Sequence, residues 1–351
     1  MIPADLSRAV VRAVRRAVEG GELGGTVPER VVVERTRPGG AGEYASPVAF
    51  QLAKGADRAR RAPLDVANTL AALLRAEPGI ARVDVTGAGF LNFTLAPRSD
   101  AALVREVLRR GPRYGYAEGA FEAGPFRWAE AVGPRERAVR EAVARIRAAQ
   151  GCREEGEDLA VAPVARRDGD VVARFGADAA RWAMLAVPPR ETPSFPSGLL
   201  AQDESNEPFL VRYAHSRARA LVRGAAGLGF PAEAAEAPDT AEAPDTAEAP
   251  DTAEASDTAE ADAADCRALA GLLADHPLVL EAAAHHRAPE RLCRHLVTVA
   301  DVLLDHQHHV LPRGDEKPSA AHRARLALAE AAGTVLAGGL ALLGMDAPDF
   351  L

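Results

Sequence analysis

Histidines, cysteines and arginines are the residues of this 351-residue chain most able to do chemistry, and their spacing decides which chemistry is open to them. Three histidines lie within four positions, and His306 and His309 would share one face of a helix. No cysteine pair or carboxylate pair completes a tetrahedral set, and Cys152, Cys266 and Cys293 are far apart. We therefore expect no metal, no cofactor and no disulfide framework, and a reducing, cytoplasmic location.

A row of cationic side chains is the second pattern with chemical potential. Arg212, His215, Arg219 and Arg223 recur every three or four residues within one expected helix, so they fall on a single stripe. Such a stripe could follow a phosphate backbone, each contact adding sequence-independent, salt-sensitive affinity. The alternative is that His215 and Tyr213 are interior residues that tie the helix to its neighbours. That alternative is favoured for Tyr213, and both interpretations stay open for the arginines.

The net charge of −8 conceals a basic surplus, because the acidic residues are concentrated. Residues 231–260 carry ten acidic and no basic residues, whereas residues 1–120 carry 18 basic and 13 acidic ones. A mild surplus permits phosphate contact without requiring it. No secretory leader is expected, since the first twenty residues contain four arginines, and no membrane span is expected, since charges interrupt the apolar stretches.

Residues 1–116 are predicted to form one α+β domain, an antiparallel sheet with helices. Leu6, Val10 and Val14 lie on a helical stripe, and the four arginines of the same segment most simply form a solvated face. Gly87–Gly89 joins two expected strands as a hairpin, which excludes a dinucleotide-binding loop. The further elements expected here are a strand at 30–35, a helix opened by Pro63, strands at 83–85 and 90–95, and a helix from Ser99 or Asp100 to about Arg110.

Residues 174–351 are predicted to form an all-α bundle, reached through a linker at 117–173 that holds one amphipathic helix, Pro134–Ala149, and an acidic loop. A six-residue acidic repeat at 236–262 lacks bulky apolar residues, so the insert at 231–262 is expected to be a disordered spacer. Gly333, Gly338 and Gly339 would let another helix of the bundle approach closely. The expected helices are 177–185, 208–223, 263–275, 289–310 and 320–343.

Five segments, in order along the chain, resemble arginyl-tRNA synthetase. ERTRPGGAGEYASPVAFQLAK (34–54) and VDVTGAGFLNFTL (83–95) resemble the N-terminal additional domain of that family. FGADAARWAMLA (175–186), SNEPFLVRYAHSRARALVR (205–223) and RLALAEAAGTVLAGGLALLGMDAPDFL (325–351) resemble its anticodon-binding bundle, which is named for an Asp-Ala-Leu-Arg motif. The resemblance implies the two domains already outlined, and it implies tRNA as the partner.

The catalytic part of that family has no counterpart in the sequence. Class I synthetases need a nucleotide-binding parallel sheet, and about 50 residues between the two recognised parts leave no room for it. The His-x-Gly-His signature is absent, although residues 133–152 resemble the helix that follows it. PVARRDGDVV (163–172) resembles the second signature loop, with Arg166 and Arg167 where a lysine should meet pyrophosphate. We therefore expect neither a Rossmann catalytic domain nor aminoacylation.

The resemblance implies contact with the D-arm and the anticodon region of tRNA. Tyr44, Gln51 and Lys54 are the candidates in the N-terminal domain, and Pro47 replaces a family asparagine, which leaves base-specific recognition open. A basic cluster of Arg58, Arg60 and Arg61 follows them. The alternative function is a protein-interaction scaffold or regulator of translation without RNA binding, with a complete aminoacyl-tRNA synthetase as a candidate partner. An active ligase is the third interpretation and is disfavoured.

Overall fold

The computed structural model describes residues 1–36, 39–55, 61–127, 132–153, 159–235 and 253–351. They divide into two compact units, Met1–Arg98 and Ser99–Leu351. The first unit therefore ends before the helix α4 (Asp100–Arg110), whereas the sequence predicts a first domain that reaches residue 116. The boundary differs because α4 packs against the helices α9 (Ala253–His286) and α11 (Ala320–Leu343) of the second unit.

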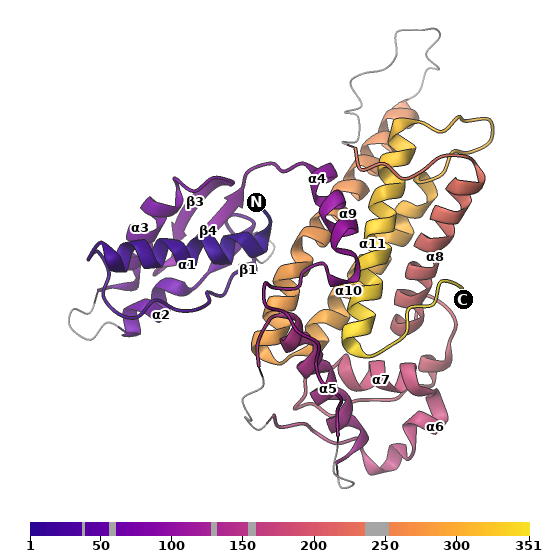
Figure 1. Cartoon of the computed structure of the whole chain (residues 1–351), viewed down its shortest axis with the longest axis horizontal. Helices are drawn as coiled ribbons and strands as arrows, with labels where there is room; N and C mark the ends of the chain where they lie inside the picture. The colour runs from indigo at the N-terminus through magenta and orange to yellow at the C-terminus, as the bar shows by residue number, and fades with distance from the viewer. Residues whose placement is uncertain (37–38, 56–60, 128–131, 154–158, 236–252) are drawn as a thin grey trace. The chain divides into compact units, whose positions relative to one another are not determined.

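A four-stranded antiparallel sheet with three helices forms the first unit (Figure 1), which confirms the predicted α+β class. The strand order is β1-β2-β4-β3, and Ala45 of β2 lies opposite Asn92 of β4. Helices α2 and α3 contact the sheet, and α1 packs on α3. The elements are α1 (Pro3–Glu19), β1 (Glu34–Arg35), β2 (Tyr44–Ser46), α2 (Val48–Gly55), α3 (Pro63–Leu74), β3 (Ile80–Thr86) and β4 (Phe90–Leu95).

Two sequence expectations for this unit can be compared with the structure. Apolar residues of α1 such as Leu6 and Val10 are fully buried, and its four arginines are exposed, as the stripe predicts. The strand expected at 30–35 is wrong over most of its length, because only Glu34–Arg35 pairs in the sheet. The carbonyl of Val31 accepts a hydrogen bond from the Ser7 hydroxyl (2.8 Å), which replaces a strand partner.

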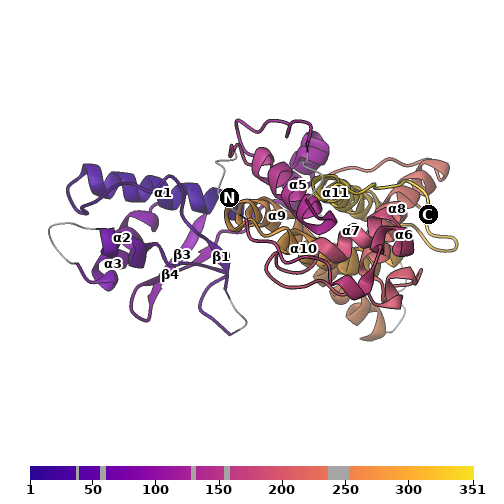
Figure 2. The ribbon, with the colours of Figure 1, turned by 90° about the horizontal axis from the view of Figure 1, so that it is seen from below.

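The second unit is a helical bundle built around α11, which lies between α9 and α8 (Figures 1 and 2) and confirms the predicted all-α class. Gly333, Gly338 and Gly339 make the expected close contacts, since a Cβ at each would lie within 2.8 Å of a neighbouring atom. The helices besides α4, α9 and α11 are α5 (Pro134–Ala149), α6 (Val171–Phe175), α7 (Ala177–Leu185), α8 (Glu207–Gly227) and α10 (Pro289–His306).

The acidic insert is shorter than the sequence suggests. Helix α9 begins at Ala253, inside the segment expected to be disordered, and it continues through Pro277 to His286. Residues 236–252, which hold most of the repeat, lie outside the described residues, as does the acidic stretch 154–158. At the start of the insert, the backbone N–H of Glu233 donates a hydrogen bond to the carbonyl of Arg323 (3.2 Å), so this part of the insert is held against the bundle.

Helix α11 is long and apolar enough to cross a membrane by length and composition, a property that the sequence interpretation does not include. Within the described part of the chain it is the one helix that meets this test. Its most apolar 18-residue window is 78% buried inside the unit, against α8, α10, α4 and α9. Burial in the bundle therefore accounts for its composition.

Candidate RNA-binding surfaces

The predicted residues of the first unit divide into one core residue and two surface residues. Tyr44 is buried in β2, and Arg35 lies over its ring with Cζ 5.6 Å from the centroid. Gln51 and Lys54 are exposed on α2, three residues apart and therefore on neighbouring turns of one face. Tyr44 can shape this surface through the sheet, whereas Gln51 and Lys54 are available to a ligand.

An exposed aromatic residue next to α2 is not among the residues that the sequence predicts. Phe90 begins β4, is 46% exposed, and its ring lies 4.9 Å from the ring of Phe50 on α2. Exposed rings can stack on the bases of single-stranded RNA. The sequence signal that could have identified Phe90 is its position: it follows the glycine turn at 87–89 and is the first residue of β4. Of the predicted basic cluster, Arg61 is exposed, and Arg58 and Arg60 lie outside the described residues.

The stripe on α8 lies along one helix, as the spacing requires, and each of its four members already contacts another part of the chain. Arg212 pairs with Asp178 of α7 (NH1–Oδ2 3.4 Å). His215 is buried, and its Nδ1 lies 3.0 Å from the carbonyl oxygen of Gly333. The interior interpretation therefore fits His215, while Tyr213 is half-buried and stacks on Phe209 with centroids 5.8 Å apart.

Residues that follow α11 fold back onto the other end of the stripe. Gly344 ends α11 in the left-handed conformation, and the chain then runs to Asp349, whose Oδ1 accepts a hydrogen bond from Nε of Arg219 (3.2 Å). Arg223 donates to the carbonyl of Asp349 (3.2 Å), and its Cζ lies 4.1 Å from the ring centroid of Phe350. A carboxylate and an aromatic ring thus occupy the places that a phosphate and a base could take. We call Asp349 and Phe350 the capping segment.

The segment that resembles catalytic signatures is built for packing. Arg135 of α5 is 1% exposed, and its guanidinium donates to the carbonyls of Met184, Ala162, Glu191 and Pro188. The pKa of Arg135 is lowered, chiefly by burial. In the loop 163–172, Arg166 to Asp168 forms a 3-10 helix, and Asp170 caps α6 by accepting from the N–H of Ala173 (3.0 Å).

Between residues 117 and 175, the described positions contain α5, α6 and the 3-10 helix, and none of them is in a strand. The sheet of the described chain is entirely antiparallel. Among the described residues, no three His, Cys, Asp or Glu side chains are grouped to hold a metal ion. His306 is buried, with Nδ1 3.8 Å from Sγ of Cys266.

These surfaces lie on a small α+β unit and on a helical bundle, and each unit contains a match to a known domain family. Residues 4–95 match the arginyl tRNA synthetase N terminal domain family, and residues 211–351 match the DALR anticodon binding domain family. Two parts of the chain therefore match domain families of arginyl-tRNA synthetase, as the sequence resemblance predicts.

Comparison with individual proteins gives the same result. The chain is 42% identical to an arginine–tRNA ligase of Frankia alni over 206 residues, which is 55% of this chain and 35% of that protein. It is 45% identical to the ligase of Micrococcus luteus over 120 residues, 33% of this chain and 21% of that protein. The chain thus spans about a third or less of these relatives. The Thermus thermophilus arginyl-tRNA synthetase structure matches over 100% of each chain with a TM-score of 0.59 and 15% identity, which supports the fold alone.

Proposed function

We propose that this protein binds tRNA, through its D-arm and anticodon regions, and does not aminoacylate it. The observation that carries the proposal is the retention of an N-terminal domain and an anticodon-binding domain around a segment that contains no described strand. Because class I chemistry requires a parallel nucleotide-binding sheet, a segment whose described residues form helices and no strand supports the absence of an ATP site. We also propose a cytoplasmic location, since none of the three cysteines, all in described positions, forms a disulfide.

Binding is tested by removing charge from the α8 stripe. A variant with Arg212, Arg219 and Arg223 all replaced by Gln should bind a tRNA transcript more weakly than the wild type. Every phosphate–arginine interaction that the variant removes should also make the negative slope of log K against log salt shallower by about 0.9. Filter binding across a salt series measures both quantities. Equal affinity and slope in the two proteins would refute the role of the stripe.

The absence of catalysis is tested separately by ATP–pyrophosphate exchange with arginine. We expect exchange at the background rate, because the lysine of the second signature loop is replaced and Asp170 of that loop is engaged as a helix cap. Exchange clearly above background in the purified chain would overturn this half of the proposal and leave tRNA binding standing.

One observation favours a second candidate function, a protein-interaction scaffold. Asp178 and Asp349 already neutralise arginines of the stripe, which is what a bundle without RNA contact would retain. This alternative predicts co-purification with another protein, such as a complete aminoacyl-tRNA synthetase. In a pull-down treated with nuclease, partners bridged by RNA would disappear, whereas direct protein partners would remain.

A further inference from the structure

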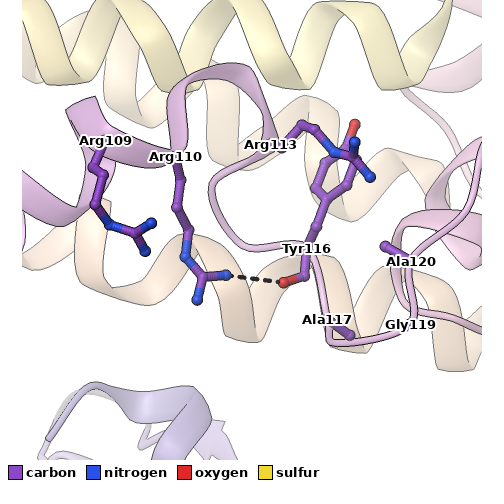
Figure 3. Close-up of a pocket in the computed structure, with 7 residues that line it drawn as sticks. All are labelled: Arg109, Arg110, Arg113, Tyr116, Ala117, Gly119 and Ala120. Carbon is purple, nitrogen blue, oxygen red and sulfur yellow. Dashed lines mark hydrogen bonds between the residues drawn. The ribbon is translucent and has the colours of Figure 1, made fainter.

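A cavity of about 370 Å³ lies within the second unit, at the C-terminal end of α4 and on the segment that follows it (Figure 3). It is lined by Arg109, Arg110, Arg113, Tyr116 and the small residues of the loop 117–120. None of these residues belongs to the α8 stripe or to the surface of α2. We call this concave site the arginine pocket.

Glu106 orients two of the three guanidinium groups. Arg109 donates to both of its carboxylate oxygens, from Nε (2.8 Å) and NH2 (2.7 Å), and Arg110 donates to one of them from Nε (2.6 Å). These bonds lower the pKa of Glu106 to about 2, chiefly through the hydrogen bond from Arg109, so Glu106 is ionised at neutral pH. The three side chains together carry one net positive charge, and they are fixed in direction while still exposed.

Arg113 supplies a second positive charge beside an aromatic ring. Its Cζ lies 5.5 Å from the ring centroid of Tyr116, and among the described residues no carboxylate is within ion-pair distance of it. The pKa of Tyr116 is raised, mainly by burial, so its hydroxyl stays neutral and can donate a hydrogen bond. The backbone carbonyl of Tyr116 also accepts from NH1 of Arg110 (3.2 Å), which joins the two sides of the pocket (Figure 3).

The loop that closes the pocket is held by helix α5 and so does not need a ligand to form. The N–H of Ala117 donates to the carbonyl of Ala149 (3.0 Å), and the side chain of Gln150 donates to the carbonyl of Gly115 (3.0 Å). On the other side, the backbone of Pro112 packs directly on Gly338 of α11. A preformed site loses little affinity to ordering of the protein.

Forked guanidinium groups match the oxygens of a phosphate, and a cavity of this volume is in the range of small-ligand sites. A tetrahedral phosphate can accept from several directions at once, which suits three arginines that line one cavity. We propose that the arginine pocket binds the phosphate group of a nucleotide, either free in solution or within an RNA chain. The pocket can do so whether or not the α8 stripe contacts tRNA.

Isothermal titration of the intact chain at low salt tests the free source, with 5′-AMP and inorganic pyrophosphate as probes. Replacing Arg113 with Gln should weaken binding at least tenfold, since a charged pair of hydrogen-bond donors is removed, and replacing it with Lys should have a smaller effect because charge is kept. The matched control is Arg190→Gln, which removes the same charge from an exposed side chain of the same unit. The control should bind like the wild type.

A tRNA transcript tests the second source by filter binding over a salt series. If the phosphate belongs to RNA, Arg113→Gln should make the negative slope of log K against log salt shallower by about 0.9, beyond any change in Arg190→Gln. A selective loss of affinity with either probe supports the pocket and identifies the source. The proposal is overturned if Arg113→Gln and Arg190→Gln bind all three ligands equally. Variants of Arg219 and Arg223 report on the stripe alone, so failure of the pocket and failure of the proposed function are distinguishable.

Discussion

The capping segment makes the most informative prediction about the α8 stripe. If RNA phosphates bind Arg219 and Arg223, they must displace Asp349 and Phe350 from the same guanidinium groups. Replacing both residues in an Asp349→Asn, Phe350→Ala double variant removes these internal competitors. We therefore expect the variant to bind tRNA more tightly than the wild type.

The magnitude follows from the two contacts. The Arg219–Asp349 pair joins side chains that are 42% and 49% exposed, and exposed pairs contribute about 0.2–1 kcal/mol. The ring of Phe350 is 72% exposed, and a cation–π contact at an exposed site contributes about 0.5–1 kcal/mol. Together they amount to about 1–2 kcal/mol, which is roughly a five- to thirty-fold increase in affinity.

The assay is equilibrium filter binding of a tRNA transcript at fixed salt, with Asp346→Asn as the matched control. Asp346 is an exposed acid three residues before Asp349, so its replacement gives the same change in net charge. The control should raise affinity much less than the double variant. A fall in affinity would refute the reasoning, because it would make the capping segment part of the RNA-binding surface.

Three further predictions concern the bundle that supports the stripe. Burial lowers the pKa of His295 from 6.5 to about 4, so the neutral form is favoured in the folded state. About 3 kcal/mol of stability should therefore be lost as the pH falls from about 6.5 towards 4. Urea unfolding of His295→Gln should show a flatter pH dependence than the wild type, and parallel curves for the two proteins would contradict this origin. Arg135→Met should lower the unfolding free energy by about 3–5 kcal/mol, because the buried carbonyls lose their hydrogen-bond donor. A decrease below about 1 kcal/mol in urea unfolding would argue against a stabilising role for these hydrogen bonds. Gly338→Ala should destabilise the protein by about 1–3 kcal/mol, because its Cβ would lie 2.5 Å from the carbonyl oxygen of Pro112. Gly271→Ala is the control: with open space around it, this change should be neutral or stabilising by up to about 1 kcal/mol. Equal melting temperatures for the two variants would contradict the packing argument.

Local signals predict much of the fold. Pro63 at the start of α3 and Ser99 at the cap of α4 identify helix starts, and the expected bounds of α5, α7 and α11 match the structure. Each of these depends on residues a few positions apart, whose chemistry acts on the adjacent backbone. The valines before Glu34 lack such a signal, because their carbonyls are taken by side chains distant in sequence, including Ser7.

The sites are less predictable for the same reason. Spacing alone places Arg219 and Arg223 on one face of α8, since helical periodicity is local. Their contact with Asp349 joins positions more than 120 residues apart, and no pattern near either end announces it. Arg113 and Tyr116 likewise carry no recognisable signal, because the cavity they line exists only after α5 and α11 have packed against their segment.

The central claim is that two RNA-binding ends function together without a catalytic middle. Its most direct test is equilibrium binding of the intact chain to a tRNA transcript and to an unstructured RNA of the same length, at about 50 and 200 mM salt. We predict binding at the lower salt that favours tRNA and weakens steeply at the higher salt. No detectable binding at the lower salt, also after deletion of residues 236–252, would contradict the account.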